Sequence, residues 1–288
     1  MTFPNHLKGA IFLTYIWASD PHGTGVKWIE LIEKAKAKYP NSQLVLGGDY
    51  IDGRKNSRDT LDYVIHEYLK GAVVLPGNHE DLMVDWVENT GIYDLDLWLY
   101  NGGKTTIRSL LGRSFNNATK AKALLKQSEE YQFIKELILK GKDMYETENI
   151  IFTHAGISDT TTNFHAKLWL REEYIYQDKM YLSKQDNKTP FYNAWKHNLT
   201  GKSIVTGHTP TCMITGSYDT FGTFVKDIPS ISRLDTHPKS YNCPVLTVQY
   251  PEEAPKYFTD NGCHAELANH FGNICVFNDS GKLIEVFS

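Results

Sequence analysis

The segment Gly48-Asp49-Tyr50-Ile51-Asp52-Gly53 follows a short apolar run, Gln43–Leu46, which is predicted to be a β-strand. A helical pattern covers Ser57–Lys70. The next apolar run, Ala72–Leu75, again stops at a polar group, Gly77-Asn78-His79-Glu80. Strands that alternate with helices in this way indicate βαβ units and a largely parallel sheet.

The same pattern extends on both sides of this segment. Further strands are expected at Phe12–Ala18, Asn149–Phe152, Ser203–Val205 and Pro244–Tyr250, with helices at Val26–Lys38 and, as one helix or a pair, Asn117–Lys140. Asn273–Asn278 is expected to pair with Leu283–Phe287 across an Asp279-Ser280-Gly281 turn. We therefore predict an α/β fold with a β-rich C-terminal part. Because no internal repeat or Pro/Ser-rich linker interrupts the chain, residues 1–288 are predicted to form a single domain.

Composition excludes several classes of protein. Of the 288 residues, 41% are hydrophobic and 22% are charged, which is unlike a disordered chain, a collagen-like repeat or a coiled-coil rod. The net charge of −4 gives no overall attraction to nucleic acid or to an anionic membrane. We therefore expect neither a nucleic-acid polymer nor a membrane as partner, and the sequence leaves the oligomeric state open.

Cysteine usage and the first residues indicate a cytoplasmic protein. The cysteines Cys212, Cys243, Cys263 and Cys275 include no CxxC pair, which argues against a zinc ribbon or a redox dithiol and favours buried thiols in a reducing compartment. The first nineteen residues resemble a signal peptide in their apolar run. Cleavage there would separate a strand from Asp20 and His22, so we reject that interpretation.

Polar clusters follow five of the predicted strands. They are Asp20 with His22, Asp49 with Asp52, Asn78 with His79, His154, and His208. The carboxyl ends of neighbouring strands in an open α/β sheet meet at one crevice, so we expect these side chains to surround one site. Carboxylate, amide and imidazole donors suit Mn, Fe or Zn better than Ca. Each cluster taken alone is also ordinary turn chemistry, but five such turns together favour a metal site.

The other histidines lack this context. His165, His197, His237, His264 and His270 do not follow a predicted strand end, and we expect them to be structural.

Taken in order, the motifs resemble those of the calcineurin-like metallophosphoesterases. They are Asp20-Pro21-His22-Gly23, Gly48–Gly53, Gly77–Glu80, His154-Ala155-Gly156 and Gly207-His208-Thr209-Pro210. More narrowly, the chain resembles the phosphoprotein phosphatase branch in its small bacterial and bacteriophage form. Leu168–Glu173 resembles the phosphate-binding Trp-x-Arg segment of that branch, and Asp260-Asn261-Gly262-Cys263 resembles its late Asp-x-Gly-Cys turn. The resemblance implies the metallophosphoesterase fold, in which mixed β-sheets are sandwiched together and flanked by helices.

The resemblance also implies a binuclear centre with two divalent ions, most favourably Mn, with Fe or Zn as alternatives. Asp20 and His22 would bind the first ion, Asp49 would bridge both, and Asn78, His154 and His208 would complete the second site. A hydroxide bridging the metals would attack phosphorus in line. His79 would protonate the leaving oxygen, and Asp52 would orient its imidazole.

Arginine placement departs from the branch. Arg54 comes one position later than the usual Asp-Arg-Gly arginine, and Pro76 stands where the branch often has arginine. Arg171 is therefore the first candidate to clamp phosphate, and Arg54 is the second. Arg171 has an alternative interpretation, an ion pair with Glu172 or Glu173 on a helix surface.

These features favour a metal-dependent phosphomonoesterase, specifically a protein serine/threonine phosphatase, whose partner is a phosphorylated protein or a small phosphoester. A nucleotide phosphohydrolase, such as a symmetrical diadenosine-tetraphosphate hydrolase, is the alternative. The Tyr- and Lys-rich stretch 174–196 could stack a base and contact phosphates, or form a packed rim or lid. A non-catalytic binding module is a third hypothesis. It is disfavoured because all six candidate ligands and the His79/Asp52 pair are intact.

Overall fold

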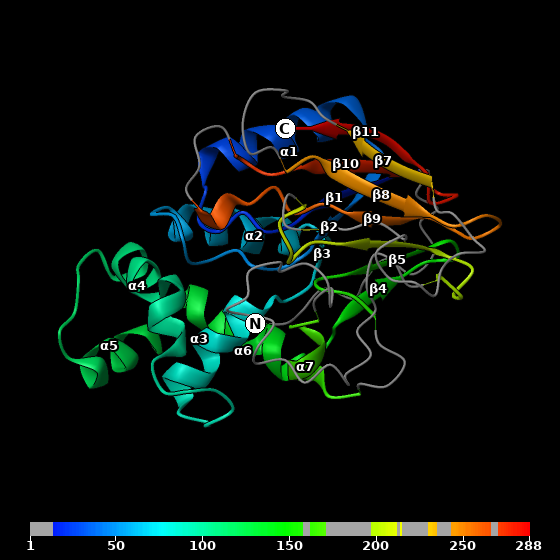
Figure 1. The fold of residues 1–288 in the computed structure, drawn as a ribbon. Coiled ribbons are helices and arrows are strands. Elements are labelled where there is room, and N and C mark those ends of the chain that lie inside the picture. Colours follow the sequence, from blue (N-terminus) through cyan, green and yellow to red (C-terminus); the bar gives the residue numbers. More distant parts are fainter. Residues whose placement is uncertain are drawn as a thin grey trace.

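The computed structural model describes residues 14–157, 162–170, 197–211, 214, 230–234, 243–265 and 270–288. Two β-sheets lie face to face, with helices gathered on one side of them (Figure 1). This arrangement confirms the predicted α/β class with mixed sheets flanked by helices.

The first sheet has the strand order β11-β10-β1-β2-β3. Its strands are β1 (Thr14–Ala18), β2 (Ser42–Leu46), β3 (Val73–Val74), β10 (Ile274–Asn278) and β11 (Leu283–Phe287). β1, β2 and β3 are parallel, whereas β10 is antiparallel to both β1 and β11. The parallel strands therefore end at the same edge of the sheet, and the predicted C-terminal hairpin is present.

The second sheet has the order β4-β5-β6-β9-β8-β7. Its strands are β4 (Met144–Glu146), β5 (Ile150–Thr153), β6 (Ser203–Thr206), β7 (Ser230–Leu234), β8 (Val245–Gln249) and β9 (Lys256–Phe258). β5, β6 and β9 are parallel, and the remaining pairs are antiparallel. The expectation of one largely parallel sheet is therefore wrong. Alternation of strand and helix predicts only local parallel units, and it carries no signal for the antiparallel strands that extend them.

An apolar layer joins the two sheets. Trp17 on β1 stacks on Phe152 of β5 with ring centroids 5.6 Å apart, and Phe277 of β10 packs against the same Phe152 ring at 6.0 Å. The indole Nε1 of Trp17 donates a hydrogen bond to Oγ1 of Thr259, 2.9 Å away. The packing fixes the sheets against each other, so strand ends from both can contribute to one site.

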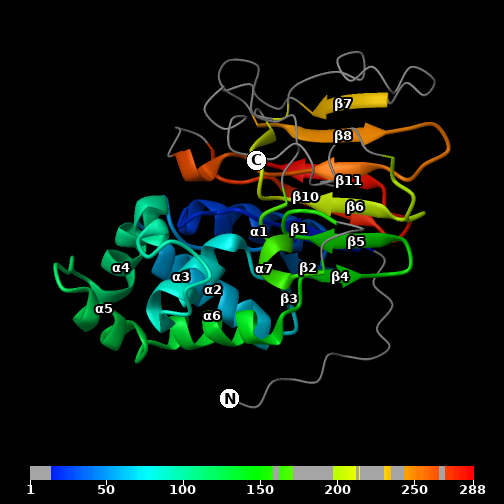
Figure 2. The ribbon, with the colours of Figure 1, turned by 60° about the horizontal axis from the view of Figure 1, so that its bottom comes forward.

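Some helices cover the first sheet, and the others form a lobe beside the sheets (Figure 2). The helices are α1 (Val26–Lys38), α2 (Ser57–Leu69), α3 (Asn78–Glu88), α4 (Lys104–Leu111), α5 (Ala118–Leu125), α6 (Glu129–Lys140) and α7 (Phe164–Lys167). α1 packs on β1, β10 and β11, and α3 packs on α6. In the part of the chain that the structure describes, no helix is long and apolar enough to cross a membrane.

Local capping explains why the predicted helix at 117–140 is a pair. Asn117 caps α5 by accepting a hydrogen bond from the backbone N–H of Lys120, and Ser128 caps α6 by accepting one from Tyr131. A cap in the middle of an apolar pattern ends one helix and starts the next.

Two shorter elements matter for the site, η1 (Leu99–Gly103) and η4 (Cys263–Ala265).

We expect Phe152→Ala to destabilise the fold by about 3–5 kcal/mol, because it leaves a cavity between the sheets. The free energy of unfolding measured in urea would show this. Leu139→Ala on the exposed side of α6 is the matched control, and it should change stability by less than about 0.5 kcal/mol. A loss at Phe152 no larger than the control's would contradict a shared core between the sheets.

Candidate metal centre

The predicted site residues occupy unusual backbone conformations at the strand ends. Seven non-glycine residues in the described ranges have positive φ. Five of them are predicted site residues, namely Asp20 (54°), His22 (45°), Asp49 (56°), Asp52 (70°) and His208 (64°). Such conformations are costly outside glycine and persist where surrounding structure enforces them, typically at functional sites.

Two glycines allow the loops to approach the aspartates closely. A Cβ atom on Gly207 would lie 1.9 Å from Oδ2 of Asp20, and one on Gly77 would lie 2.1 Å from Oδ1 of Asp49. Next to these glycines, the backbone N–H of His208 donates to Oδ1 of Asp20 (2.8 Å), and that of His79 donates to Oδ1 of Asp49 (3.0 Å). The glycines in both motifs are therefore required by contact with the carboxylates.

The Asp49 carboxylate lies at the centre of the site. Nε2 of His22 is 3.6 Å from its Oδ2, and Nε2 of His154 is 3.5 Å from its Oδ1. Nε2 of His154 is also 3.2 Å from Oδ1 of Asn78. Two sets of three residues each offer potential ligand atoms that lie within 4.8 Å of one another inside the set. The first set is Asp20, His22 and Asp49, and the second is Asp49, His154 and His208. Asp49 belongs to both sets, as the bridging position requires.

Backbone carbonyls orient two of these imidazoles. Nδ1 of His22 is 3.1 Å from the carbonyl oxygen of Ile51, and Nδ1 of His154 is 2.7 Å from that of Gly47. A carbonyl only accepts, so Nδ1 carries a proton in each ring, and Nε2 is the nitrogen that faces Asp49. This outer hydrogen bond is typical of metal-ligating histidines.

The charge balance at the site fits divalent cations. Burial raises the pKa of Asp20 and of Asp49 well above the usual range, and the charges of Asp260 and of Glu80 add to this effect. Burial lowers the pKa of His22 well below its usual range. No group in the described part of the chain makes a well-formed hydrogen bond to the buried Oδ2 of Asp20. Buried carboxylates beside the imidazole of His22 form an environment that a divalent cation would stabilise.

Glu80 holds the two central loops together. Its carboxylate accepts hydrogen bonds from the backbone N–H groups of Asp49, Tyr50 and Gly77, each at 2.8 Å. Burial raises the pKa of Glu80 to about 7. The sequence motif contained Glu80, but its role emerges only when the β2 and β3 loops are seen side by side.

His79 and Asp52 form a buried pair beside Asp49. Nδ1 of His79 is 2.7 Å from Oδ2 of Asp52, and that carboxylate also accepts from Nε1 of Trp98 (3.0 Å) and Oγ1 of Thr106 (2.6 Å). Burial raises the pKa of Asp52 to about 8. Trp98 and Thr106 were missed by the sequence analysis, because neither residue type nor spacing distinguishes them from ordinary helix residues.

The phosphate-binding candidates are only partly placed. Arg171 and the stretch 174–196 lie outside the described residues. The preceding Trp169 is near the centre, with its ring centroid 6.2 Å from that of His208, and its Nε1 donates to the hydroxyl of Tyr93 (2.9 Å). Nε of Arg54 donates to the carbonyl oxygen of Cys263 (2.8 Å), which ties Arg54 to the late Asp-x-Gly-Cys turn.

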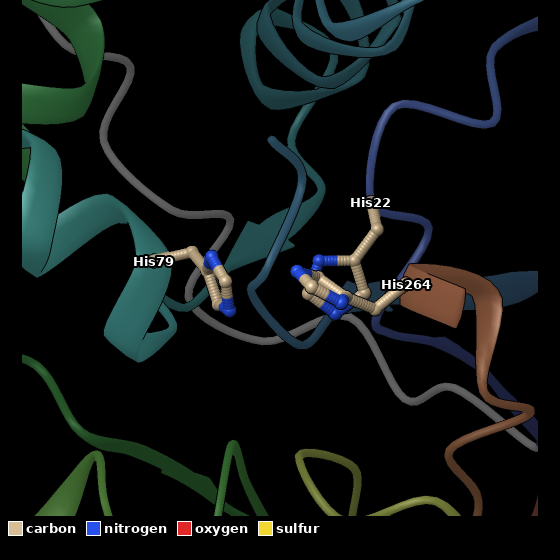
Figure 3. A group of neighbouring side chains, drawn as sticks. All are labelled: His22, His79 and His264. Atoms are coloured by element: carbon tan, nitrogen blue, oxygen red, sulfur yellow. The ribbon is translucent and has the colours of Figure 1, made fainter. Parts of the chain in front are cut away.

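His264 lies at the site, contrary to the expectation that it is a structural histidine (Figure 3). Its ring centroid is 4.7 Å from that of His22 and 5.2 Å from that of His79. Its position directly after the Asp-x-Gly-Cys turn is the one signal that could have indicated this. By contrast, His165 pairs with Asp81 at 2.9 Å.

Comparisons with known proteins agree with this geometry. The model of the calcineurin-like phosphoesterase family matches residues 13–231. The chain belongs to this family. Its members are metal-dependent phosphoester hydrolases, so the chain is an enzyme of that class. No curated protein sequence matches this phosphoesterase significantly.

Several solved structures are similar to this chain. One is a candidate diadenosine tetraphosphatase, with 12% identity and a TM-score of 0.51, covering 96% of this chain and 95% of that chain. Another is a metallophosphoesterase from Sphaerobacter thermophilus, with 14% identity and a TM-score of 0.42, covering 95% and 88%. A third is a cold-active protein-tyrosine phosphatase from a psychrophilic Shewanella species, with 14% identity and a TM-score of 0.37, covering 96% and 81%.

Replacing Glu80 by Gln should destabilise the phosphoesterase by about 1–3 kcal/mol, because one amide N–H would face a backbone N–H that needs an acceptor. Urea unfolding at pH 8 measures the loss, and calorimetric Mn²⁺ titration should show weaker binding because Asp49 loses its support. Glu30→Gln removes only an exposed ion pair with Lys27 and is the control. Equal stability of the two variants would contradict the role given to Glu80.

Proposed function

We propose that this phosphoesterase is a protein serine/threonine phosphatase with two divalent ions, Mn²⁺ being favoured. Asp20, His22 and Asp49 would hold the first ion. Asp49, Asn78, His154 and His208 would hold the second. When bound, the metals would supply Lewis-acid activation of water and of the phosphoryl oxygens. The clustering of these donors around Asp49 supports a catalytic centre and argues against a non-catalytic binding module.

The observation that carries the choice of substrate is the His79–Asp52 pair. Nδ1 of His79 is held by Asp52, so Nε2 faces the centre and lies 3.9 Å from Oδ2 of Asp49. A proton held at this Nε2 can be given to a leaving oxygen. The alkoxide leaving from phosphoserine or phosphothreonine is strongly basic and requires that proton, whereas a leaving nucleotide phosphate is a weak base. A fixed proton donor therefore favours alkyl phosphate monoesters.

Asp52 can also sustain this proton donor electrostatically. Its carboxylate is fully buried and accepts hydrogen bonds from Trp98, just before η1, and from Thr106 on α4. A fixed acceptor at Nδ1 sets the tautomer of His79 and stabilises its protonated ring. Asp52 is thus a positioning residue in this proposal.

A nucleotide polyphosphate hydrolase is the second candidate. The pocket beside α4 has a volume of about 540 Å³ and is lined by Lys55, Lys104 and Arg108 together with Thr105, Ser109 and Ser114. Three cations and three hydroxyls could bind the additional phosphates of a dinucleotide. The fold likeness to a candidate diadenosine tetraphosphatase is in line with this alternative. Comparing kcat/KM for a phosphoserine peptide with that for diadenosine tetraphosphate tests the proposal, and a strong preference for the dinucleotide would overturn it.

Asp49→Asn should reduce p-nitrophenyl phosphate hydrolysis to background even in excess Mn²⁺, because both proposed metal positions lose a ligand. His208→Asn affects one position, so its activity should recover partly as Mn²⁺ is raised. The measurement is initial rate against Mn²⁺ concentration for both variants. Asp49 would be excluded as the bridge if Asp49→Asn kept more than about a tenth of wild-type activity at saturating metal. A tenfold loss of activity corresponds to about 1.4 kcal/mol of activation free energy.

His79→Asn should lower kcat/KM for a phosphoserine peptide by about 10²–10⁴-fold, and much less for p-nitrophenyl phosphate, whose leaving group needs no proton. Asp52→Asn should show the same selectivity more weakly. His66→Asn on the exposed face of α2 is the control. All variants are compared at equal metal content, determined by elemental analysis. Equal losses on both substrates would mean that His79 acts on the metals or on water, and the general-acid role would be wrong.

A further inference from the structure

We propose that His22, His79 and His264 form an inhibitory Zn²⁺ site at the mouth of the catalytic centre, overlapping the first catalytic metal position at His22. One ring nitrogen from each residue lies within 4.8 Å of those of the other two. Figure 3 shows the three rings converging from three different parts of the chain. The residues come from the loop after β1, from the start of α3 and from η4.

Each of the three imidazoles is oriented by an acceptor. Nδ1 of His22 lies 3.1 Å from the carbonyl of Ile51, and Nδ1 of His79 lies 2.7 Å from Asp52. Nε2 of His264 is 3.2 Å from the carbonyl oxygen of Asn101. In each ring, one nitrogen thus has an outer hydrogen-bond acceptor that fixes the orientation of the imidazole. This is the arrangement that zinc-binding histidines require.

The turn that carries His264 is fixed in place. A Cβ on Gly53 would lie 3.2 Å from Cα of His264, so the two backbones are in close contact. Nε of Arg54 donates to the carbonyl of Cys263, directly before His264. His264 is exposed, whereas His22 and His79 are buried, so an ion from solvent can reach the cluster through His264.

Three imidazoles select zinc over the harder cations. Nitrogen donors suit Zn²⁺, Cu²⁺ and Ni²⁺, whereas Mg²⁺ and Mn²⁺ prefer oxygen. Three histidines with water as a fourth ligand form a tetrahedral zinc site. His22 also belongs to the Asp20–His22–Asp49 group, so zinc at the three histidines would compete with the first catalytic metal.

Inhibition by zinc rests on the proposed function. A zinc ion on Nε2 of His79 would occupy the nitrogen that is proposed to protonate the leaving group. It would also withdraw His22 from the catalytic metal. Zinc should therefore inhibit the Mn²⁺-loaded enzyme, and added Mn²⁺ should relieve the inhibition.

The test compares wild type with His264→Asn, using His66→Asn as the control. Zinc inhibition of p-nitrophenyl phosphate hydrolysis is measured at fixed Mn²⁺, with each variant normalised to its own zinc-free rate. Losing one ligand should raise the inhibitory zinc concentration at least about tenfold in His264→Asn. The control should behave like wild type. Because zinc can also replace Mn²⁺ at the other positions in every variant, only the difference at His264 reports on the cluster.

Co²⁺ binding gives a readout independent of activity. Tetrahedral Co²⁺ at the three histidines should add strong visible absorption bands that His264→Asn lacks. Loss of those bands together with weaker zinc inhibition supports the proposal. Identical spectra for both proteins would overturn the site, and a spectral difference without a change in zinc inhibition would overturn its inhibitory role. If the bands are present in a protein that hydrolyses no phosphoester, the proposed function fails while the site stands.

Discussion

Burial of the Asp49 carboxylate beside Asp20 and Glu80 is the constraint on which the rest of the structure depends. Water is excluded from these groups, and the charges of Glu80 and Asp20 add to the effect of burial in raising the pKa of Asp49, so the carboxylates oppose one another in the folded protein. A fold keeps such a cluster only when hydrogen bonds and cations offset the repulsion. Glu80 is satisfied by three backbone N–H groups. Asp20 and Asp49 are left facing imidazoles, where divalent ions complete the balance.

The architecture can be understood as the means of holding this cluster. Parallel strands of the first sheet bring the loops with Asp20 and Asp49 to one edge, and β5 and β6 bring His154 and His208 from the second sheet. The Trp17–Phe152 contact fixes the distance between the two sets. The left-handed backbone at Asp20, His22, Asp49, Asp52 and His208 then turns each side chain inward. The strained backbone of these loops costs free energy of folding, and the apolar packing between the sheets offsets that cost.

Much of this was accessible from the sequence because the signals are local. The helix Val26–Lys38 has the predicted bounds, and the polar residues after five strands do meet at one place. What was missed depends on contacts between distant segments. Trp98 and Thr106 donate hydrogen bonds to Asp52 from a helical segment whose residue types do not distinguish it from an ordinary helix. His264 reaches the site only because the turn at Cys263 packs on Gly53 and Arg54. The antiparallel pairs β7–β8 and β8–β9 likewise join strands that no local pattern specifies as partners.

In the proposed site, Asp49 joins two metal positions built from both sheets. Crystals of the protein grown with Mn²⁺ and measured at the manganese absorption edge would show whether it does. We expect two anomalous peaks that share Asp49, one also contacting Asp20 and His22, and the other contacting Asn78, His154 and His208. A single peak, or two peaks with no common Asp49 contact, would contradict the bridging role of Asp49.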